Sequence, residues 1–372
     1  MAAPGTAFNG LTLDTLPASP ATDELLSAIL RSNPRISDLI FSPGRKFQVQ
    51  VSGEFVPFET NGVPTLTADD TRRIASDLIG NNKAAIAMLR EQGYCDVSYA
   101  LAGLARFRVN VFIQRGSCAV VMRVIPTSIP DFKSLGLPET LGEIAGLRDS
   151  LVLVTGPRGS GKSSTLAAIL NHINETETCH IITVEDPIEF LHNHRRATVH
   201  QRELHSDTPS VSLAIRAALR QAPNVIAVGE LKDRESMELA LEAAETGHLV
   251  LSTLNTLNAQ QTVERFVAAF PSAEQSSTRD RLTRMLRYII SQRLVPRREG
   301  VQRIAVFEIL KSGSKVLERL LAGTTSSKQS DQSSLDAEIE KLVRAGIVSP
   351  EIALAHAIDP KILAKKLAAA EK

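Results

Sequence analysis

The chain has 372 residues and a mass of 40.3 kDa, with 43% hydrophobic and 22% charged residues. This is the composition of a globular protein, which excludes a disordered or collagen-like chain, and the length allows two domains of roughly 100–200 residues each. Because 42 Lys and Arg nearly balance 41 Asp and Glu, the net charge of +1 provides no overall attraction to nucleic acid, and the lack of Trp argues against a platform for stacking bases.

Cysteines and targeting signals indicate the compartment. Cys95, Cys118 and Cys179 are too few and too scattered for a disulfide framework, so we interpret them as small buried side chains in a reducing compartment. The N-terminus lacks the charged and apolar segments of a secretion signal, and no stretch approaches the roughly 20 apolar residues of a membrane span. We expect a cytoplasmic protein without direct membrane insertion.

The first part of the chain predicts a flexible tail over residues 1–22 and a small α+β domain over 23–127. Phe107 and Val109 alternate with Arg106 and Arg108, which is typical of a strand with one buried face. The expected elements are helices over 23–33, 67–80 and 84–92, and strands over 47–51, 94–100, 106–112 and 118–125.

A proline-containing linker with one short helix is expected over residues 128–146, followed by an α/β domain over 147–323. Strands are predicted over 151–155, 180–184, 225–228, 249–253 and 302–309, and helices over 162–174, 211–221, 234–246, 258–269 and 273–294. The strand, loop, helix, strand order favours a parallel sheet covered by helices on both faces. Residues 324–372 are expected to form a C-terminal segment with two short amphipathic helices.

A glycine-rich motif stands between the first strand and helix of this second domain. It fits the pattern G-x-x-x-x-G-K-[ST] at each position, which indicates ATP or GTP binding. Backbone N–H groups and the helix N-terminus would hold the phosphates, Lys162 would reach the β and γ oxygens, and the Ser163 hydroxyl would bind Mg²⁺. The candidate nucleotide-binding residues are Gly156, Pro157, Arg158, Gly159, Ser160, Gly161, Lys162, Ser163 and Ser164.

Acidic residues follow two further strands. Glu185, Asp186 and Glu189 come after the strand at 180–184, and Glu230 follows the strand at 225–228. The carboxyl ends of parallel strands share one edge of a sheet, where the sites of α/β proteins lie, so Glu230 is a candidate for holding Mg²⁺ or its waters. Strand-end acids also serve as helix caps or stand in solvated loops, and that reading remains open for each one alone.

With these motifs together, the sequence resembles the PilT/PilU-type secretion ATPases, hexameric motors of type IV pilus retraction that are related to the type II secretion ATPases. The resemblance spans roughly residues 25–310 and is carried by residues 156–163, 185–189, 201–203, 219–233 and 243–248, with weaker similarity over 96–99 and 106–110. It implies a RecA-like P-loop ATPase domain preceded by a smaller PAS-like domain, with ATP and Mg²⁺ as cofactors.

The resemblance also implies roles for single residues. Glu189 matches the glutamate that orients or deprotonates the attacking water, and Glu230 matches the Walker B glutamate that acts through Mg²⁺. His248 matches a histidine near the γ-phosphate, whereas on its own it would be interpreted as a satisfied loop histidine. In the family, arginines of the first domain reach the nucleotide of a neighbouring subunit. Candidates here are Arg106, Arg108, Arg115 and Arg123, with Arg108 and Arg123 preferred, and the alternative is that they face solvent.

Three positions depart from the family pattern. Asn255 stands where a second histidine is usual, Asn224 replaces an acid, and Lys232 replaces an arginine. An amide does not titrate, and an ammonium does not reproduce the two-pronged donor of a guanidinium. A C-terminal motif associated with retraction is matched only loosely by residues 316–323. These departures leave nucleotide binding intact and question the catalytic rate and the retraction role.

Arginines at 281, 284 and 287 predict an amphipathic helix with a cationic side. A solvated helix face is the simplest interpretation, and an acidic partner surface or neighbouring subunit is the alternative.

The leading hypothesis is a hexameric, Mg²⁺-dependent ATPase that drives pilus retraction and reaches the inner membrane through a platform protein. A catalytically weak regulatory paralogue that assembles with an active pilus ATPase is the alternative. A DNA-packaging or conjugation motor of the same superfamily is disfavoured by the lack of aromatic and basic clustering, and no nucleic-acid partner is expected.

Overall fold

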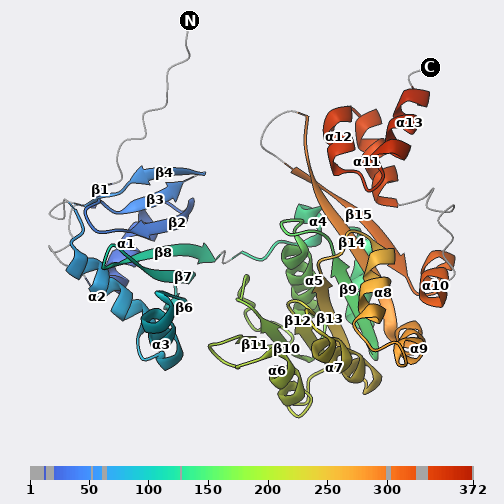
Figure 1. Ribbon diagram of the computed structural model, residues 1–372, viewed down its shortest axis with the longest axis horizontal. Coiled ribbons are helices and arrows are strands. Elements are labelled where there is room, and N and C mark those ends of the chain that lie inside the picture. Colours follow the sequence, from blue (N-terminus) through green and yellow to red (C-terminus); the bar gives the residue numbers. More distant parts are fainter. Residues whose placement is uncertain are drawn as a thin grey trace, which may run out of the picture. The chain divides into compact units, whose positions relative to one another are not determined.

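The computed structural model describes residues 12–13, 21–51, 53–60, 65–125, 128–298, 303–323 and 334–370. The chain divides near residue 128 into two compact units, with residues 189–191 grouped with the first, and each unit is described by itself (Figure 1). Most of the predicted tail over 1–22 lies outside the described residues. Residues 12 and 13 are described as a short strand, β1 (Thr12–Leu13), which pairs with β5 (Glu59–Thr60).

The first unit is built on a six-stranded antiparallel sheet with strand order β4-β3-β2-β8-β7-β6. The predicted helices and strands are present, and β2 and β4 are additional. The capping box between Thr67 and Asp70 explains where α2 begins. The elements are α1 (Thr22–Ser32), β2 (Ile36–Phe41), β3 (Gln48–Val51), β4 (Glu54–Pro57), α2 (Ala68–Ile79), α3 (Lys83–Gln92), β6 (Tyr94–Leu101), β7 (Ala105–Gln114) and β8 (Ser117–Ile125).

The second unit contains a seven-stranded sheet with order β11-β10-β12-β13-β9-β14-β15, parallel except for the antiparallel pair β14 and β15. Its strands are β9 (Ser150–Thr155), β10 (His180–Glu185), β11 (Thr198–Glu203), β12 (Val225–Val228), β13 (Leu249–Leu254), β14 (Leu286–Pro296) and β15 (Arg303–Lys311). Neighbouring residues of β9 enter opposite cores: Leu151 and Leu153 pack in one, and Val152 and Val154 in the other. Both faces are therefore buried, as the apolar strands predict.

Helices cover these two faces (Figure 1). The core around Val152 includes α5, α4 and the 3-10 segment, and the core around Leu151 includes α7, α8, α9 and α10. The helices are α4 (Phe132–Leu135), the 3-10 segment Glu139–Gly146, α5 (Lys162–Thr176), α6 (Val211–Ala218), α7 (Arg234–Glu245), α8 (Ala259–Ala268), α9 (Gln275–Met285) and α10 (Lys315–Ala322). Among the described residues, no helix is long and apolar enough to cross a membrane.

The prediction of one helix over residues 273–294 is wrong in its second half. Helix α9 ends at Met285, and the next residues form β14, which pairs with β9 on one side and β15 on the other. This segment is rich in β-branched and aromatic residues and is almost continuously buried, so pairing in the sheet outweighs its helical spacing. Arg287 consequently lies on a strand and not on the predicted cationic helix.

The C-terminal segment contains three helices where two were predicted: α11 (Ser334–Arg344), α12 (Pro350–His356) and α13 (Pro360–Ala370). Leu335, Ile339 and Leu363 pack with Val295 and Val306 of the β14–β15 hairpin. These contacts anchor the helices to the sheet. Residues 324–333 lie outside the described part of the chain.

Candidate functional site

The glycine-rich loop occupies the turn between β9 and α5. Gly161 has a φ of +89° and Gly156 a φ of +155°, and a Cβ at Gly156 would lie 2.4 Å from both the Ser160 hydroxyl and the Gln292 carbonyl oxygen. Only glycine fits this tight turn. The Lys162 ammonium donates to the carbonyl oxygens of Gly156 and Pro157 at 2.9 and 3.0 Å, so it lies over the loop.

This loop suits a phosphate. Helix α5 begins at Lys162, so the loop presents the N-terminus of a 15-residue helix, with Ser163 and Ser164 in its first turn. The Ser160 hydroxyl is buried and has no hydrogen-bond partner among the described residues. A buried hydroxyl at this place fits a bound anion that would complete its hydrogen bonding.

Gln292 of β14 contacts both the glycine-rich loop and α5, and the sequence did not predict this role. The Thr165 hydroxyl of α5 donates to Gln292 Oε1 at 2.6 Å, and both side chains are buried. A Cβ added at Gly161 would lie 2.8 Å from Gln292 Nε2. Helix α5 and the loop are therefore fastened to a strand that is 127 residues away along the chain.

Two of the acidic residues, Glu185 and Glu230, lie at the same edge of the sheet as the loop. Strands β9, β10, β12 and β13 run parallel, so Gly156, Glu185, Glu230 and Asn255 all follow or end strands at the same edge. Asn255 Nδ2 donates to Glu230 Oε1 at 2.5 Å, so the amide at the position that departs from the family pattern directly contacts Glu230.

The other two departures differ in their distance from this edge. Lys232 forms an ion pair with Asp186 at 3.1 Å, which links the segments that carry Glu230 and Glu189. The side chain of Asn224 accepts from the backbone N–H of His180 at 2.9 Å. Since His180 begins β10, Asn224 lies at the opposite edge of the sheet, so this replacement is remote from the loop.

The expectation that His248 lies near the γ-phosphate is wrong for the P-loop of its own chain. His248 precedes β13, whereas the P-loop follows the far end of the neighbouring parallel strand β9. Six strand residues at about 3.3 Å each separate these edges by about 20 Å. The His248 ring contacts the carbonyl oxygen of Ala243 at 2.9 Å, which corresponds to the interpretation as a satisfied loop histidine.

Glu189 lies in the segment between β10 and β11, which contains neither helix nor strand. The backbone N–H of His192 in this segment donates to Gln201 Oε1 at 2.8 Å, and that of Ile188 donates to Glu203 Oε2 at 3.1 Å. Burial lowers the pKa of His192 to about 4, so this ring is neutral at physiological pH.

The arginines of the first unit lie on the β7–β8 hairpin. Arg108 and Arg123 stand directly opposite each other, and both are exposed. Arg123 also pairs with the buried carboxylate of Asp38 at 2.8 Å. Like charges placed opposite each other in a sheet are unfavourable, so this face suits an anion. Arg115 occupies the hairpin turn with a φ of +47°.

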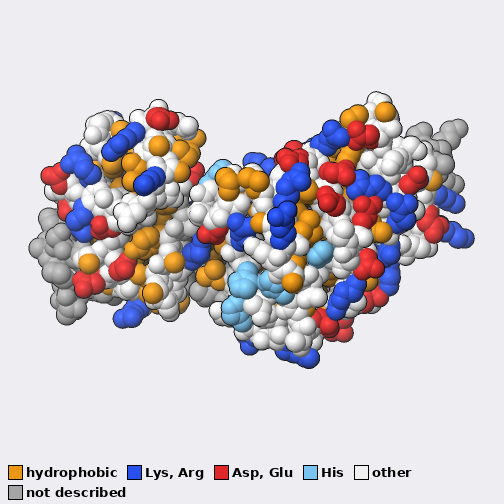
Figure 2. Space-filling view, turned by 90° about the horizontal axis from the view of Figure 1, so that it is seen from below, with side chains coloured by type: hydrophobic (Ala, Val, Ile, Leu, Met, Phe, Trp, Pro, Cys, Tyr) orange, Lys and Arg blue, Asp and Glu red, His pale blue; other side chains and the backbone are white. Residues whose placement is uncertain are grey.

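The arginines of α9 are partly neutralised within the second unit. Arg281 binds Glu245 at 2.8 Å and Glu238 at 2.7 Å, and Arg284 lies 4.0 Å from Glu245. The pKa of Glu245 is lowered, first by its hydrogen bond with Arg281. In the view of Figure 2, side chains of both signs are interspersed over the surface. Ion pairs with the glutamates of α7 thus reduce the positive charge on the predicted cationic side of this helix.

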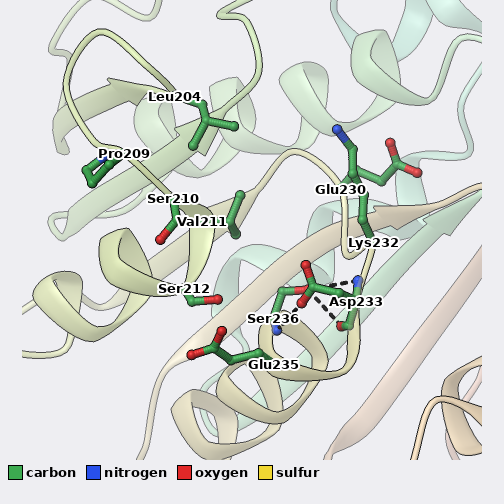
Figure 3. Close-up of a pocket in the computed structure, with 10 residues that line it drawn as sticks. All are labelled: Leu204, Pro209, Ser210, Val211, Ser212, Glu230, Lys232, Asp233, Glu235 and Ser236. Carbon is green, nitrogen blue, oxygen red and sulfur yellow. Dashed lines mark hydrogen bonds between the residues drawn. The ribbon is translucent and has the colours of Figure 1, made fainter.

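A cavity of about 310 Å³ lies beside Glu230. Figure 3 shows the two sides of this cavity. One side is lined by Leu204, Pro209 and residues 210–212 where α6 begins, and the other by Glu230, Lys232, Asp233, Glu235 and Ser236 near the beginning of α7. Asp233 caps α7 by accepting from the backbone N–H of Ser236 at 2.8 Å. Two helix N-termini therefore border the cavity beside Glu230.

Comparison with known proteins identifies the family. Residues 96–338 match the family described as "Type II/IV secretion system protein". The chain is also 40% identical over 299 residues to a "Twitching motility protein" of Neisseria gonorrhoeae, covering 78% of this chain and 79% of that protein. The chain belongs to the type II/IV secretion ATPase family.

Within this secretion ATPase family, the chain is 35% identical over 329 residues to the "Type IV pilus ATPase PilU" of Pseudomonas aeruginosa, covering 86% of this chain and 85% of that one. The crystal structure of the pilus retraction motor PilT with bound ADP aligns with a TM-score of 0.83 at 38% identity, covering 92% of this chain and 98% of that chain. The predicted PilT/PilU-type family, the ATPase class and the RecA-like fold preceded by a smaller domain are confirmed.

Proposed function

We propose that this secretion ATPase is a Mg²⁺-dependent hexameric motor that powers type IV pilus retraction in the cytoplasm, acting on a platform protein of the inner membrane. The observation that carries the proposal is the single sheet edge that joins the P-loop, Glu230 and Asn255. The likeness to twitching-motility and retraction proteins supports it.

The residues at this edge fit Mg²⁺ and ATP. The loop N–H groups and Lys162 would bind the phosphates, Ser163 and Glu230 would hold the metal directly or through water, and Glu189 would orient the attacking water. Mg²⁺ supplies neutralisation of the charge that develops on the phosphoryl oxygens. In phosphoryl transfer most of the catalysis is positioning and electrostatic stabilisation, which is what this set of residues provides.

Coupling to force would come from a second copy of the chain. The opposed Arg108 and Arg123 form a cationic pair that suits the phosphates of a nucleotide held by a neighbouring subunit. A ligand that binds better to a closed arrangement shifts the population toward it, so ATP binding and hydrolysis would drive alternating closure.

The second candidate function is a slow regulatory paralogue that assembles with an active pilus ATPase. The contact between Asn255 and Glu230 favours it, because an amide at this position holds the carboxylate and offers no proton. The existence of PilU beside PilT-type motors is consistent with such a partner.

The test is to measure native mass and pilus retraction together. The full chain with ATP and Mg²⁺ is expected to give a particle of about six protomers, and its gene is expected to restore twitching to bacteria that lack their retraction ATPase. A matched Lys162→Ala variant is the control. A particle that binds ATP but restores twitching only when an active pilus ATPase is also present supports the regulatory function. A monomer that binds ATP and restores nothing contradicts both.

A further inference from the structure

The segment from Asp186 to His192 connects β10 to β11 and carries Glu189 near its centre. It contains no helix or strand, so its backbone N–H groups receive no partners from regular secondary structure. Buried backbone donors must then be satisfied by other groups, and those groups decide the path of the segment.

Two side chains of β11 supply partners on both sides of Glu189. Glu203 Oε2 accepts from the N–H of Ile188 at 3.1 Å, and Gln201 Oε1 accepts from the N–H of His192 at 2.8 Å. The first contact lies one residue before Glu189 and the second lies three residues after it. The backbone is thus held at two points with Glu189 between them.

The spacing of these side chains follows from the strand. Successive side chains of a strand point to opposite faces, so Gln201 and Glu203 share a face with the buried Val199. Thr198 and His200 point to the other face and are exposed. A strand beside β10 can therefore present two polar groups to the loop that leaves β10.

The Gln201 amide is oriented by Glu185. Gln201 Nε2 donates to Glu185 Oε1 at 2.9 Å, and the Thr183 hydroxyl donates to the same oxygen at 2.6 Å. Because the amide nitrogen faces a carboxylate, its oxygen is the atom left to accept from His192. Glu203 is 4% exposed, so water does not replace its contact easily.

We propose that Gln201 and Glu203 are positioning residues for ATP hydrolysis, which hold the loop backbone so that Glu189 orients the attacking water. This inference rests on the proposed function, in which Glu189 performs that step. Displacing a catalytic group by about 1 Å costs up to about 100-fold in rate, so a loop without secondary structure requires such support.

The variants separate the two contacts. Glu203→Ala removes the acceptor for Ile188, whereas Glu203→Gln keeps an oxygen there. Gln201→Glu replaces the donor to Glu185 with a like charge beside it, and the repulsion moves this side chain away from Glu185 and from the N–H of His192. Thr198→Ala, on the exposed face of the same strand, is the matched control.

Steady-state ATP turnover and the affinity for a fluorescent ATP analogue are measured on the full chain. Glu203→Ala and Gln201→Glu are expected to lower kcat about 10- to 100-fold with analogue affinity within about twofold of wild type. Glu203→Gln is expected to recover most of the rate, and Thr198→Ala to leave it unchanged. Equal turnover in all variants overturns the proposal, as does a parallel loss of analogue binding, which indicates a general structural role.

A second comparison separates this proposal from the proposed function. Residues that act only through Glu189 cause no further loss once it is replaced, so Glu189→Gln with Gln201→Glu is expected to match Glu189→Gln alone. If Gln201→Glu lowers kcat by the same factor in the Glu189→Gln background as in the wild-type background, the positioning role is overturned. Wild-type turnover in Glu189→Gln itself refutes the assignment of Glu189. If Glu203→Ala does not fold, the same measurements of kcat and analogue affinity on Gln201→Glu test the proposal.

Discussion

Replacing Gln292 by Leu is expected to loosen the P-loop from the sheet. The change removes the acceptor of the 2.6 Å hydrogen bond from Thr165, whose hydroxyl is fully buried. A buried donor left without a partner costs about 1–3 kcal/mol, whereas replacing both partners by apolar groups of similar shape is close to neutral. We therefore expect Gln292→Leu to lower the free energy of unfolding by about 2 kcal/mol.

A double-mutant cycle with Thr165→Val isolates this bond. The single variants are each expected to be about 2 kcal/mol less stable than wild type. The double variant is expected to be only about 1 kcal/mol less stable, which is about 3 kcal/mol more stable than the sum of the single effects predicts. At about 2–4 °C per kcal/mol, each single change lowers Tm by about 4–8 °C.

The assay is urea unfolding of the four proteins, followed by a signal from the second unit, together with the Kd for ATP. The single variants are expected to bind ATP several-fold more weakly, because the helix that presents the phosphate-binding N–H groups is no longer fastened to β14. Single effects that add to within about 0.5 kcal/mol would refute the coupling between Thr165 and Gln292.

Three further predictions concern the same edge of the sheet. Asn255→Asp removes the donor to Glu230 and places a second carboxylate against it, so the two like charges repel each other; steady-state turnover is expected to show at least about a tenfold loss of kcat at pH 8. Burial lowers the pKa of His192 from 6.5 to about 4, so below pH 6.5 the unfolded chain binds a proton that the folded protein does not. The free energy of unfolding measured with urea should therefore fall by about 3 kcal/mol between pH 6.5 and 4, and His192→Leu should abolish this fall. Gly161→Ala should weaken ATP binding, measured by titration, more than Gly159→Ala does. Both glycines have a positive φ, but only at Gly161 does an added Cβ meet Gln292 of β14. Equal losses of ATP affinity in the two variants would contradict this prediction.

The P-loop and the acidic strand ends could be predicted from the sequence because both are local. The loop motif is contiguous, and the apolar strands before it and before Glu230 are short, unbroken and buried. The parallel order then fixes which edge the following residues share.

Other features depend on partners far along the chain. Strand β11 was missed because only Val199 of its six residues is apolar, and its polar side chains face the loop before it. Gln292 lies in a segment whose spacing resembled a helix, and its partner Thr165 is 127 residues away. His248 was misplaced because a motif gives residue identity and not the edge of the sheet on which the residue lies.

In the proposed function, this secretion ATPase hydrolyses ATP at the sheet edge that joins the P-loop and Glu230, with Glu189 orienting the attacking water. The most direct test of this function is phosphate release from ATP by the purified full chain with Mg²⁺, compared with Glu189→Gln and Lys162→Ala. Turnover is expected in the wild type, only a low residual turnover with retained ATP binding in Glu189→Gln, and loss of both in Lys162→Ala. Tight ATP binding by the wild type without turnover would contradict it.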